Sequence, residues 1–128
     1  FNNNIDNKKI QQKRKLALIH NLGLRWPILI FNLVSNATVM ISRNLFKKVG
    51  FLNEDVNLRA VEDYEYWIRC FKKSDGYFIN KRLLNYRIHD NRISNDDEGK
   101  SKRKYIFHSL YKKKIINKFE YLISFLKI

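Results

Sequence analysis

Residues 61–73 carry the clearest local signal in this sequence. Their apolar side chains recur with the spacing of one helical face: Val61, Tyr64, Ile68 and Phe71, with Trp67 alongside. This spacing predicts an α-helix that packs against a core. Two carboxylates, Glu62 and Asp63, stand at the start of the helix, although the chain has only 12 acidic residues against 26 basic ones. The position of these two acids therefore needs an explanation.

Acids at the start of a helix have an ordinary structural role. Carboxylates in the first turn accept hydrogen bonds from free N–H groups and interact favourably with the helix dipole. Here the helix is apolar enough to be buried, and the polar loop of residues 52–60 delivers the chain to its start. That setting at the edge of a core also allows a catalytic role, and the residues alone leave both interpretations open.

Composition predicts one folded, strongly basic domain. The 128 residues are 45% hydrophobic and 14% aromatic, too rich for a disordered chain, and their formal net charge is +14. The longest apolar run, residues 26–31, is far shorter than the roughly 20 residues of a membrane-spanning helix. The single cysteine, Cys70, rules out an intramolecular disulfide and suits a reducing, cytoplasmic setting.

The first third of the chain predicts a helix followed by strands. Residues 8–20 are basic and permit a helix, and Gly23 and Pro27 then interrupt the pattern. Residues 28–42 are rich in β-branched side chains and predict one or two strands, the second near residues 37–41.

A short helix is predicted next, over residues 43–49. Ser42 is suited to cap its start, and Gly50 is suited to end it in a left-handed helical conformation. We expect Phe51 to fold back onto the apolar side of this helix.

The second half of the chain predicts short strands and a long final helix. Residues 74–76 end the helix that begins near Val61, and residues 77–89 alternate well enough for one or two strands with a break near Asn80. Residues 90–104 are predicted to be a loop, followed by a basic amphipathic helix that runs to the end of the chain.

Three segments, taken in order and spacing, resemble a known enzyme family. They are "SNATVMISRNLFKKVGFLNED" (35–55), "VEDYEYWIRC" (61–70) and "LLNYRIHDNRIS" (83–94). Together they resemble the C-terminal, acceptor-side half of the inverting nucleotide-sugar glycosyltransferases with the GT-A fold, the large "family 2" type. The resemblance implies an α/β fold, a partial GT-A domain with a mixed sheet flanked by helices over residues 1–97. A basic amphipathic helical segment, residues 98–128, would follow.

The resemblance also implies catalytic roles. The acidic pair of the family falls on Glu62 and Asp63, with Asp63 as the general base that takes a proton from the acceptor hydroxyl. Trp67 lies one helical turn beyond Asp63 and would offer a ring on which a sugar can stack. A core aromatic is the competing interpretation of Trp67.

Four more residues match the family pattern near its substrates. His89 falls where such enzymes carry a histidine that helps to hold the metal or the diphosphate. Arg87 would pair with the leaving diphosphate or brace its loop. Ser35 and Asn36 precede a strand that passes close to the acceptor in the family.

The chain departs from the family in its donor-binding part. Complete enzymes begin with a βαβ nucleotide-binding half whose Asp-x-Asp motif holds a divalent metal, Mg or Mn, and the phosphates of the donor. The acidic string at residues 96–98 lies in a polar stretch and is predicted to be solvated charge. We therefore expect this chain to be a fragment of a metal-dependent hexosyltransferase, inactive without the nucleotide-binding half.

The resemblance implies a nucleotide-sugar donor and a glycan or lipid-linked acceptor, in bacterial-type surface polysaccharide or glycan synthesis. The basic C-terminal segment, residues 100–128, also predicts contact with an anionic membrane surface, which would place the protein at the inner face of the membrane. Its apolar residues recur at helical spacing: Ile106, Leu110, Ile115, Phe119, Ile123 and Leu126. The same stripe could instead pack on the domain while the lysines are solvated.

Two other functions remain open from the residues alone. The charge fits a nucleic-acid-binding module, but the sequence has no helix-turn-helix pairing, zinc-ligand spacing or aromatic RNA-binding strand. A non-catalytic interaction module is the other alternative. Strands near residues 34–41 and 77–88, if left without neighbours, would expose a sheet edge, so we expect homo-oligomers.

Overall fold

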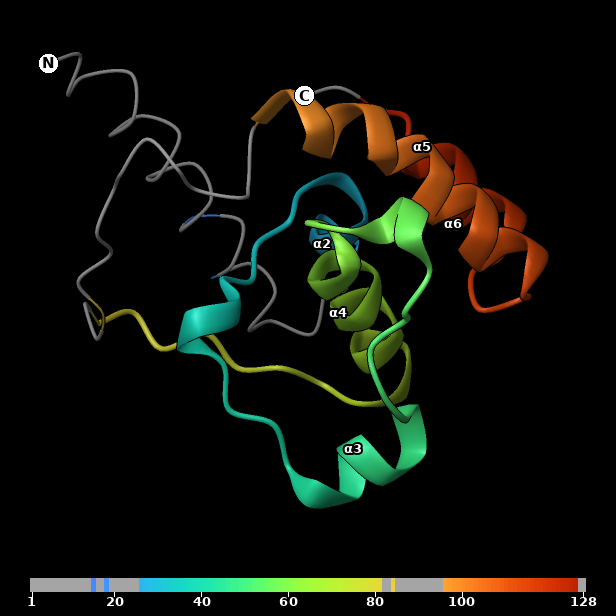
Figure 1. The fold of residues 1–128 in the computed structure, drawn as a ribbon. Coiled ribbons are helices and arrows are strands. Elements are labelled where there is room, and N and C mark those ends of the chain that lie inside the picture. Colours follow the sequence, from blue (N-terminus) through green and yellow to red (C-terminus); the bar gives the residue numbers. More distant parts are fainter. Residues whose placement is uncertain (1–14, 16–17, 19–25, 82–83, 85–95, 127–128) are drawn as a thin grey trace, which may run out of the picture.

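The computed structural model describes residues 15, 18, 26–81, 84 and 96–126, and the helices in this part surround a small core (Figure 1). The helices are α2 (Pro27–Ile30), α3 (Arg43–Val49), α4 (Glu62–Lys73), α5 (Asp96–Lys112) and α6 (Lys118–Ile123), with 3₁₀ turns η1 (Asn36–Thr38) and η2 (Val56–Leu58). No strand occurs among these residues, so the mixed sheet is not seen here. The helix predicted over residues 8–20 lies almost wholly outside the described part.

Helix α4 lies at the centre of the described structure, with α3 on one side and α5 and α6 on the other (Figure 1). The helix predicted from the apolar spacing of residues 61–73 is present as α4. Tyr64 on its inner face contacts Ile28 of α2 and Phe107 of α5. Five core side chains are almost fully buried: Leu58, Ile68, Ile106, Phe107 and Leu110. The rings of Tyr64 and Phe107 meet edge to face at 6.0 Å. Burial of these apolar groups is the main force that holds α4 in place.

The first predicted strand is wrong, because residues 27–30 form the helical turn α2. Pro27 occupies the first helical position, where its missing N–H costs nothing and its fixed φ suits a helix. All four residues are buried. An apolar run this short fits a buried strand or a buried helical turn, so its contacts with other elements decide between them.

The segment near residues 37–41 also differs from the predicted strand. Thr38 closes the turn η1 by donating from its N–H and its hydroxyl to the carbonyl of Ser35, both at 2.9 Å. Val39 is extended but has no partner strand in the described part. Leu33 and Ile41 pack partly against the core, so these side chains do not form the exposed sheet edge that was expected.

Helix α3 begins and ends where predicted, with Ser42 as its N-cap, but Gly50 does not adopt the left-handed helical conformation that was expected of it. The Ser42 hydroxyl oxygen accepts a hydrogen bond from the N–H of Leu45 at 3.2 Å. Gly50 ends the helix with φ of 81° and ψ of −156°, a backbone region that is essentially restricted to glycine. Phe51 folds back so that its ring meets Phe46 edge to face at 5.2 Å.

The C-terminal part forms two helices, where one helix after a loop was predicted. Helix α5 already begins at Asp96, so residues 96–98 are the first residues of a helix and not part of a loop. The chain then turns through Lys114, whose φ is 56°. Asn117 and Glu120 form a reciprocal capping box that starts α6.

The predicted apolar stripe divides between these two helices. Ile106 and Leu110 are fully buried against the domain, whereas Phe119 and Leu126 are 71% and 56% exposed. The packing interpretation therefore holds for α5, and the outer face of α6 remains uncovered. None of the described helices is long and apolar enough to cross a membrane.

Candidate catalytic site at the start of α4

Glu62 and Asp63 are the first two residues of α4, as predicted. Val61 occupies the N-cap position and makes no side-chain hydrogen bond there. Asp63 Oδ1 accepts a hydrogen bond from the N–H of Tyr64 at 2.6 Å, so one of its oxygens stabilises the first turn. Both acids are half-buried. The pair therefore meets the edge of the core, where a carboxylate is partly withdrawn from water.

This position changes the acidity of Asp63. Burial raises the pKa of its carboxyl above the usual value of 3.8. The hydrogen bond from the N–H of Tyr64 lowers the pKa in part, and the neighbouring charge of Glu62 raises it. A carboxylate with a raised pKa holds a proton more strongly, so it is a better base than an exposed aspartate.

Two buried polar atoms near this helix start have no hydrogen-bond partner in the described part of the chain: Glu62 Oε2 and Trp67 Nε1. One is an acceptor and the other a donor. An unsatisfied buried polar group costs about 1–3 kcal/mol. A hydrogen bond to a ligand hydroxyl or to an ordered water would remove that cost.

Tyr64 fixes the start of α4 from the core side. Its hydroxyl donates to the carbonyl of Ile28 at 2.8 Å, which ties α4 to α2. Burial raises the pKa of Tyr64 to about 12, so the hydroxyl stays protonated as this donor requires. Arg103 of α5 lies 3.3 Å from the same hydroxyl oxygen.

Arg103 is a structural residue that the sequence did not reveal. Its guanidinium donates to the carbonyls of Ile30, of Leu29 at 2.6 Å and of Ser124 at 2.8 Å. It also lies 5.1 Å from the ring centre of Phe107. One side chain thus satisfies carbonyl groups at the C-terminal ends of both α2 and α6. No local pattern points to it, because its partners lie far away along the chain.

Arg69 supports α4 from the opposite side. Its Nε donates to both carboxylate oxygens of Glu65 at 3.0 Å, and its two terminal nitrogens donate to the carbonyls of Val49 and Phe51 at 2.8 Å each. These bonds join the end of α3 to α4. The four-residue spacing of Glu65 and Arg69 was the available sequence signal for the ion pair. The two carbonyl contacts had no such signal.

The other predicted site residues are placed as follows. Ser35 and Asn36 are exposed around η1, and no hydrogen bond or ion pair in the described part joins them to Glu62 or Asp63. Trp67 is 8% exposed, which leaves little of its ring open to a sugar and favours the core interpretation. Arg87 and His89 lie outside the described residues.

The described residues do not form a metal centre. They contain no group of three or more histidine, cysteine, aspartate or glutamate side chains that could hold an ion. The start of α4 contributes two carboxylates, Glu62 and Asp63.

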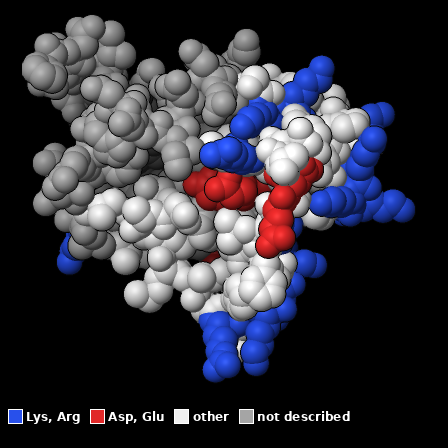
Figure 2. Space-filling model, in the orientation of Figure 1, with Lys and Arg blue, Asp and Glu red and all other residues white. Residues whose placement is uncertain are grey.

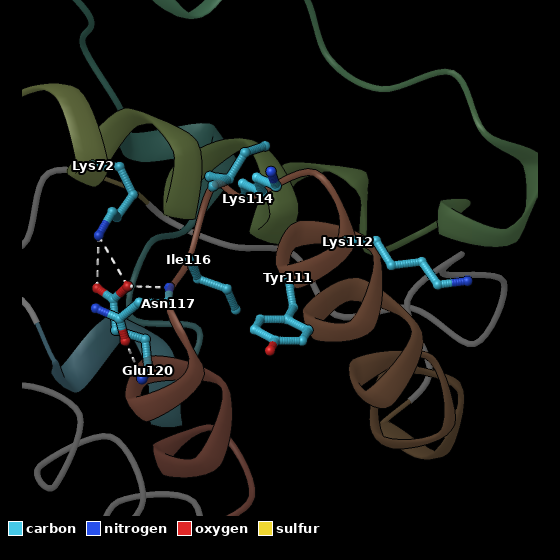
Figure 3. Close-up of a pocket in the computed structure, with 8 residues that line it drawn as sticks. Lys72, Tyr111, Lys112, Lys114, Ile116, Asn117 and Glu120 are labelled. Atoms are coloured by element: carbon cyan, nitrogen blue, oxygen red, sulfur yellow. Dashed lines mark hydrogen bonds and ion pairs between the residues drawn. The ribbon is translucent and has the colours of Figure 1, made fainter.

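Two cavities lie near α6 and away from the acidic pair. One, of about 620 Å³, is bordered by Lys72, Tyr111 and the turn between α5 and α6 (Figure 3). Lys72 and Glu120 both line this cavity and form an ion pair at 2.7 Å (Figure 3). The second, of about 290 Å³, is an apolar groove between α2, α4 and α6. Neither cavity is lined by Glu62 or Asp63.

Charge is distributed unevenly over the surface. Figure 2 shows acidic side chains gathered in the middle of one face, while lysine and arginine side chains project from its edges. Arg69 donates to the buried carboxylate of Glu65 and to a backbone carbonyl, and Arg103 donates to backbone carbonyls. These two positive charges therefore stabilise the fold.

Two curated proteins resemble this chain. An uncharacterized glycosyltransferase of Rickettsia typhi and another of Rickettsia prowazekii are each 33% identical to it over 67 residues. Part of this chain is therefore similar to proteins named as glycosyltransferases. The similar region covers 52% of the chain and 20% of each relative, so the chain matches about a fifth of their length. No family model matches the chain. No solved structure matches it either.

Proposed function

We propose that this chain is the acceptor-side part of an inverting nucleotide-sugar glycosyltransferase of the GT-A, "family 2" type. The observation that carries the proposal is Asp63, a half-buried carboxylate at the first turn of a core helix whose pKa is raised by burial. The similarity to two glycosyltransferases supports the reaction class. The donor is a nucleotide-activated sugar, and the acceptor is a glycan or lipid-linked hydroxyl compound.

In the proposed reaction Asp63 is the general base. The acceptor oxygen forms a bond to the anomeric carbon from the face opposite the nucleotide diphosphate. The bond from that carbon to the diphosphate breaks, and its electron pair leaves with the diphosphate. The acceptor proton passes to the Asp63 carboxylate, and a single displacement inverts the anomeric centre.

Glu62 and Trp67 would assist by binding and orientation. The unpaired Oε2 of Glu62 can accept a hydrogen bond from a second hydroxyl of the acceptor, and the charge of Glu62 keeps the pKa of Asp63 high. The Nε1–H of Trp67, on a side chain that is 8% exposed, can donate to an ordered water. Arg87, His89, Ser35 and Asn36 keep the substrate and metal roles implied by the family resemblance.

The test is Asp63→Asn in the longer enzyme that contains the nucleotide-binding half. We expect sugar transfer to fall by about 10²- to 10⁴-fold, the usual effect of losing a general base, while nucleotide-sugar binding is retained. Glu54→Gln is the matched control, because Glu54 is an exposed carboxylate on the loop before α4. Near-wild-type turnover by the Asp63 variant would refute the assignment of the base.

A further inference from the structure

The outer face of α6 is apolar and uncovered. Phe119 and Leu122 are 71% and 57% exposed, and their spacing of three residues places them on one side of α6. Leu126, 56% exposed, follows just beyond the end of the helix. Phe125, 46% exposed, meets the ring of Tyr121 edge to face at 5.0 Å. The opposite side of the same segment is anchored in the domain, where Ser124 is 2% exposed. The exposed side chains therefore form a continuous face, here called the α6 face.

Four exposed lysines lie at the corner where α5 ends and α6 begins. Lys112, Lys113 and Lys114 are exposed at the end of α5, and Lys118 is exposed at the start of α6. Glu120 is the one acid of residues 100–126, and Lys72 of α4 pairs with it at 2.7 Å. Beyond Glu120, the charge of Lys113 acts on the carboxyl of Asp55 and lowers its pKa, and the four lysines leave the corner between α5 and α6 with an excess of positive charge.

The domain holds this face rigidly. Glu120 is fixed both by its ion pair with Lys72 and by the capping box with Asn117. The guanidinium of Arg103 donates a hydrogen bond to the carbonyl of Ser124 at the C-terminal end of α6. The ring of Tyr121 stacks on Tyr111 of α5 at 4.9 Å. Apolar side chains on an anchored support lose little conformational freedom when they enter another apolar medium.

We propose that the corner between α5 and α6 docks this protein on an anionic membrane surface. Phe119, Leu122 and Leu126 enter the boundary between headgroups and acyl chains, and the lysines at 112–114 and 118 contact the lipid phosphates. An apolar face flanked by lysine is what interfacial binding requires. A bilayer is favoured over a second copy of the chain, because two copies, each with a net charge of +14, repel each other.

The apolar surface continues inward from the α6 face. Phe119 also lines the groove of about 290 Å³ between α2, α4 and α6, together with Ile28, Leu29 and Ile68. A hydrocarbon chain displaced from the bilayer would find apolar contacts there. This proposal does not depend on Asp63, so it stands or falls separately from the proposed enzymatic activity.

The test is cosedimentation of the chain with phosphatidylcholine vesicles that contain or lack phosphatidylglycerol. We expect binding to the anionic vesicles alone, weakening as salt rises. The triple variant Lys112→Gln, Lys113→Gln and Lys114→Gln removes three charges, each worth about fivefold in binding near an anionic surface, so we expect a loss of about 100-fold. Phe119→Ser with Leu122→Ser should lower binding by about tenfold or more.

Matched control variants distinguish binding through the α6 face from nonspecific binding through other exposed apolar or charged residues. Met40→Ser changes a side chain that is 97% exposed, and Lys47→Gln with Lys48→Gln removes charge from α3. These variants should bind almost like the wild type, allowing for the charge lost in α3. Leu126→Ser, beyond the end of α6, is a second probe of the apolar face in case α6 itself does not tolerate substitution.

Three results would overturn the proposal. They are equal binding to both kinds of vesicle, equal losses in the control and α6 variants, or no vesicle binding by a folded wild-type chain. A concentration-dependent dimer that Phe119→Ser abolishes, with no vesicle binding, would instead assign the α6 face to contact between copies.

Discussion

Arg69 and Glu65 form a buried ion pair in which the guanidinium Nε lies 3.0 Å from both carboxylate oxygens. The side chains are 15% and 1% exposed, so Glu65 has almost no access to water. The remaining guanidinium nitrogens bind the carbonyls of Val49 and Phe51. This pair therefore orients α4, and with it the acidic residues at the start of the helix, against the end of α3.

Loss of Arg69 should destabilise the fold strongly. Arg69→Met leaves the Glu65 charge buried without a partner, which costs about 3–5 kcal/mol. The free energy of unfolding, measured by urea denaturation, tests this. The double variant Glu65→Met with Arg69→Met should be less destabilised than Arg69→Met alone. Arg43→Met, at an exposed position of α3, is the control and should change stability by less than about 0.5 kcal/mol.

Arg103→Met should loosen both α2 and α6. The carbonyls of Leu29 and Ser124 lose a charged donor, and hydrogen bonds to charged groups contribute about 1.5–3 kcal/mol each. Hydrogen exchange should rise in both helices, and Lys104→Met, at the exposed neighbouring position, should leave it unchanged. Arg103→Lys should recover only part of the stability, because an ammonium group lacks the fork that reaches several carbonyls. Unchanged exchange in Arg103→Met would show that the clamp is not needed.

Asp63→Asn should raise the melting temperature at neutral pH. Burial raises the pKa of Asp63 in the folded chain, so folding disfavours its charged form. The resulting penalty is present above the folded pKa and vanishes below the usual value of 3.8, where both states are protonated. Calorimetry across pH should therefore show a gain at pH 7 that disappears in acid. A lower melting temperature at pH 7 would mean that the aspartate charge stabilises the helix.

Glu62→Gln should shift the pH dependence of sugar transfer in the longer enzyme. The charge of Glu62 raises the pKa of Asp63, so removing that charge lowers this pKa. The base is active when deprotonated, and the acidic limb of the kcat profile should move to lower pH. Glu54→Gln should leave the limb where it is. If the acidic limb of the kcat profile does not move in Glu62→Gln, a group other than Asp63 determines the pH at which activity is lost.

The sequence alone determined the local features of this protein. Ser42 caps the start of α3 and Gly50 ends it. Both are local features, because a cap depends only on the side chain or the backbone preference of a residue next to the helix end. The apolar spacing of residues 61–73 defined α4 and the place of Asp63 at its start. Asn117 and Glu120 carried a signal of the same kind for α6 that the prediction of one continuous helix overlooked.

Tertiary structure alone decided which contacts hold these elements together and how far the pKa of Asp63 departs from its usual value. Residues 27–30 are helical, and their carbonyls find donors in Tyr64 and Arg103, which lie 36 to 74 positions away along the chain. The pKa of Asp63 depends on how much water the packed core excludes from it. Hydrogen bonds between distant residues and desolvation arise only after packing, so no neighbouring residue in the sequence can encode them by itself.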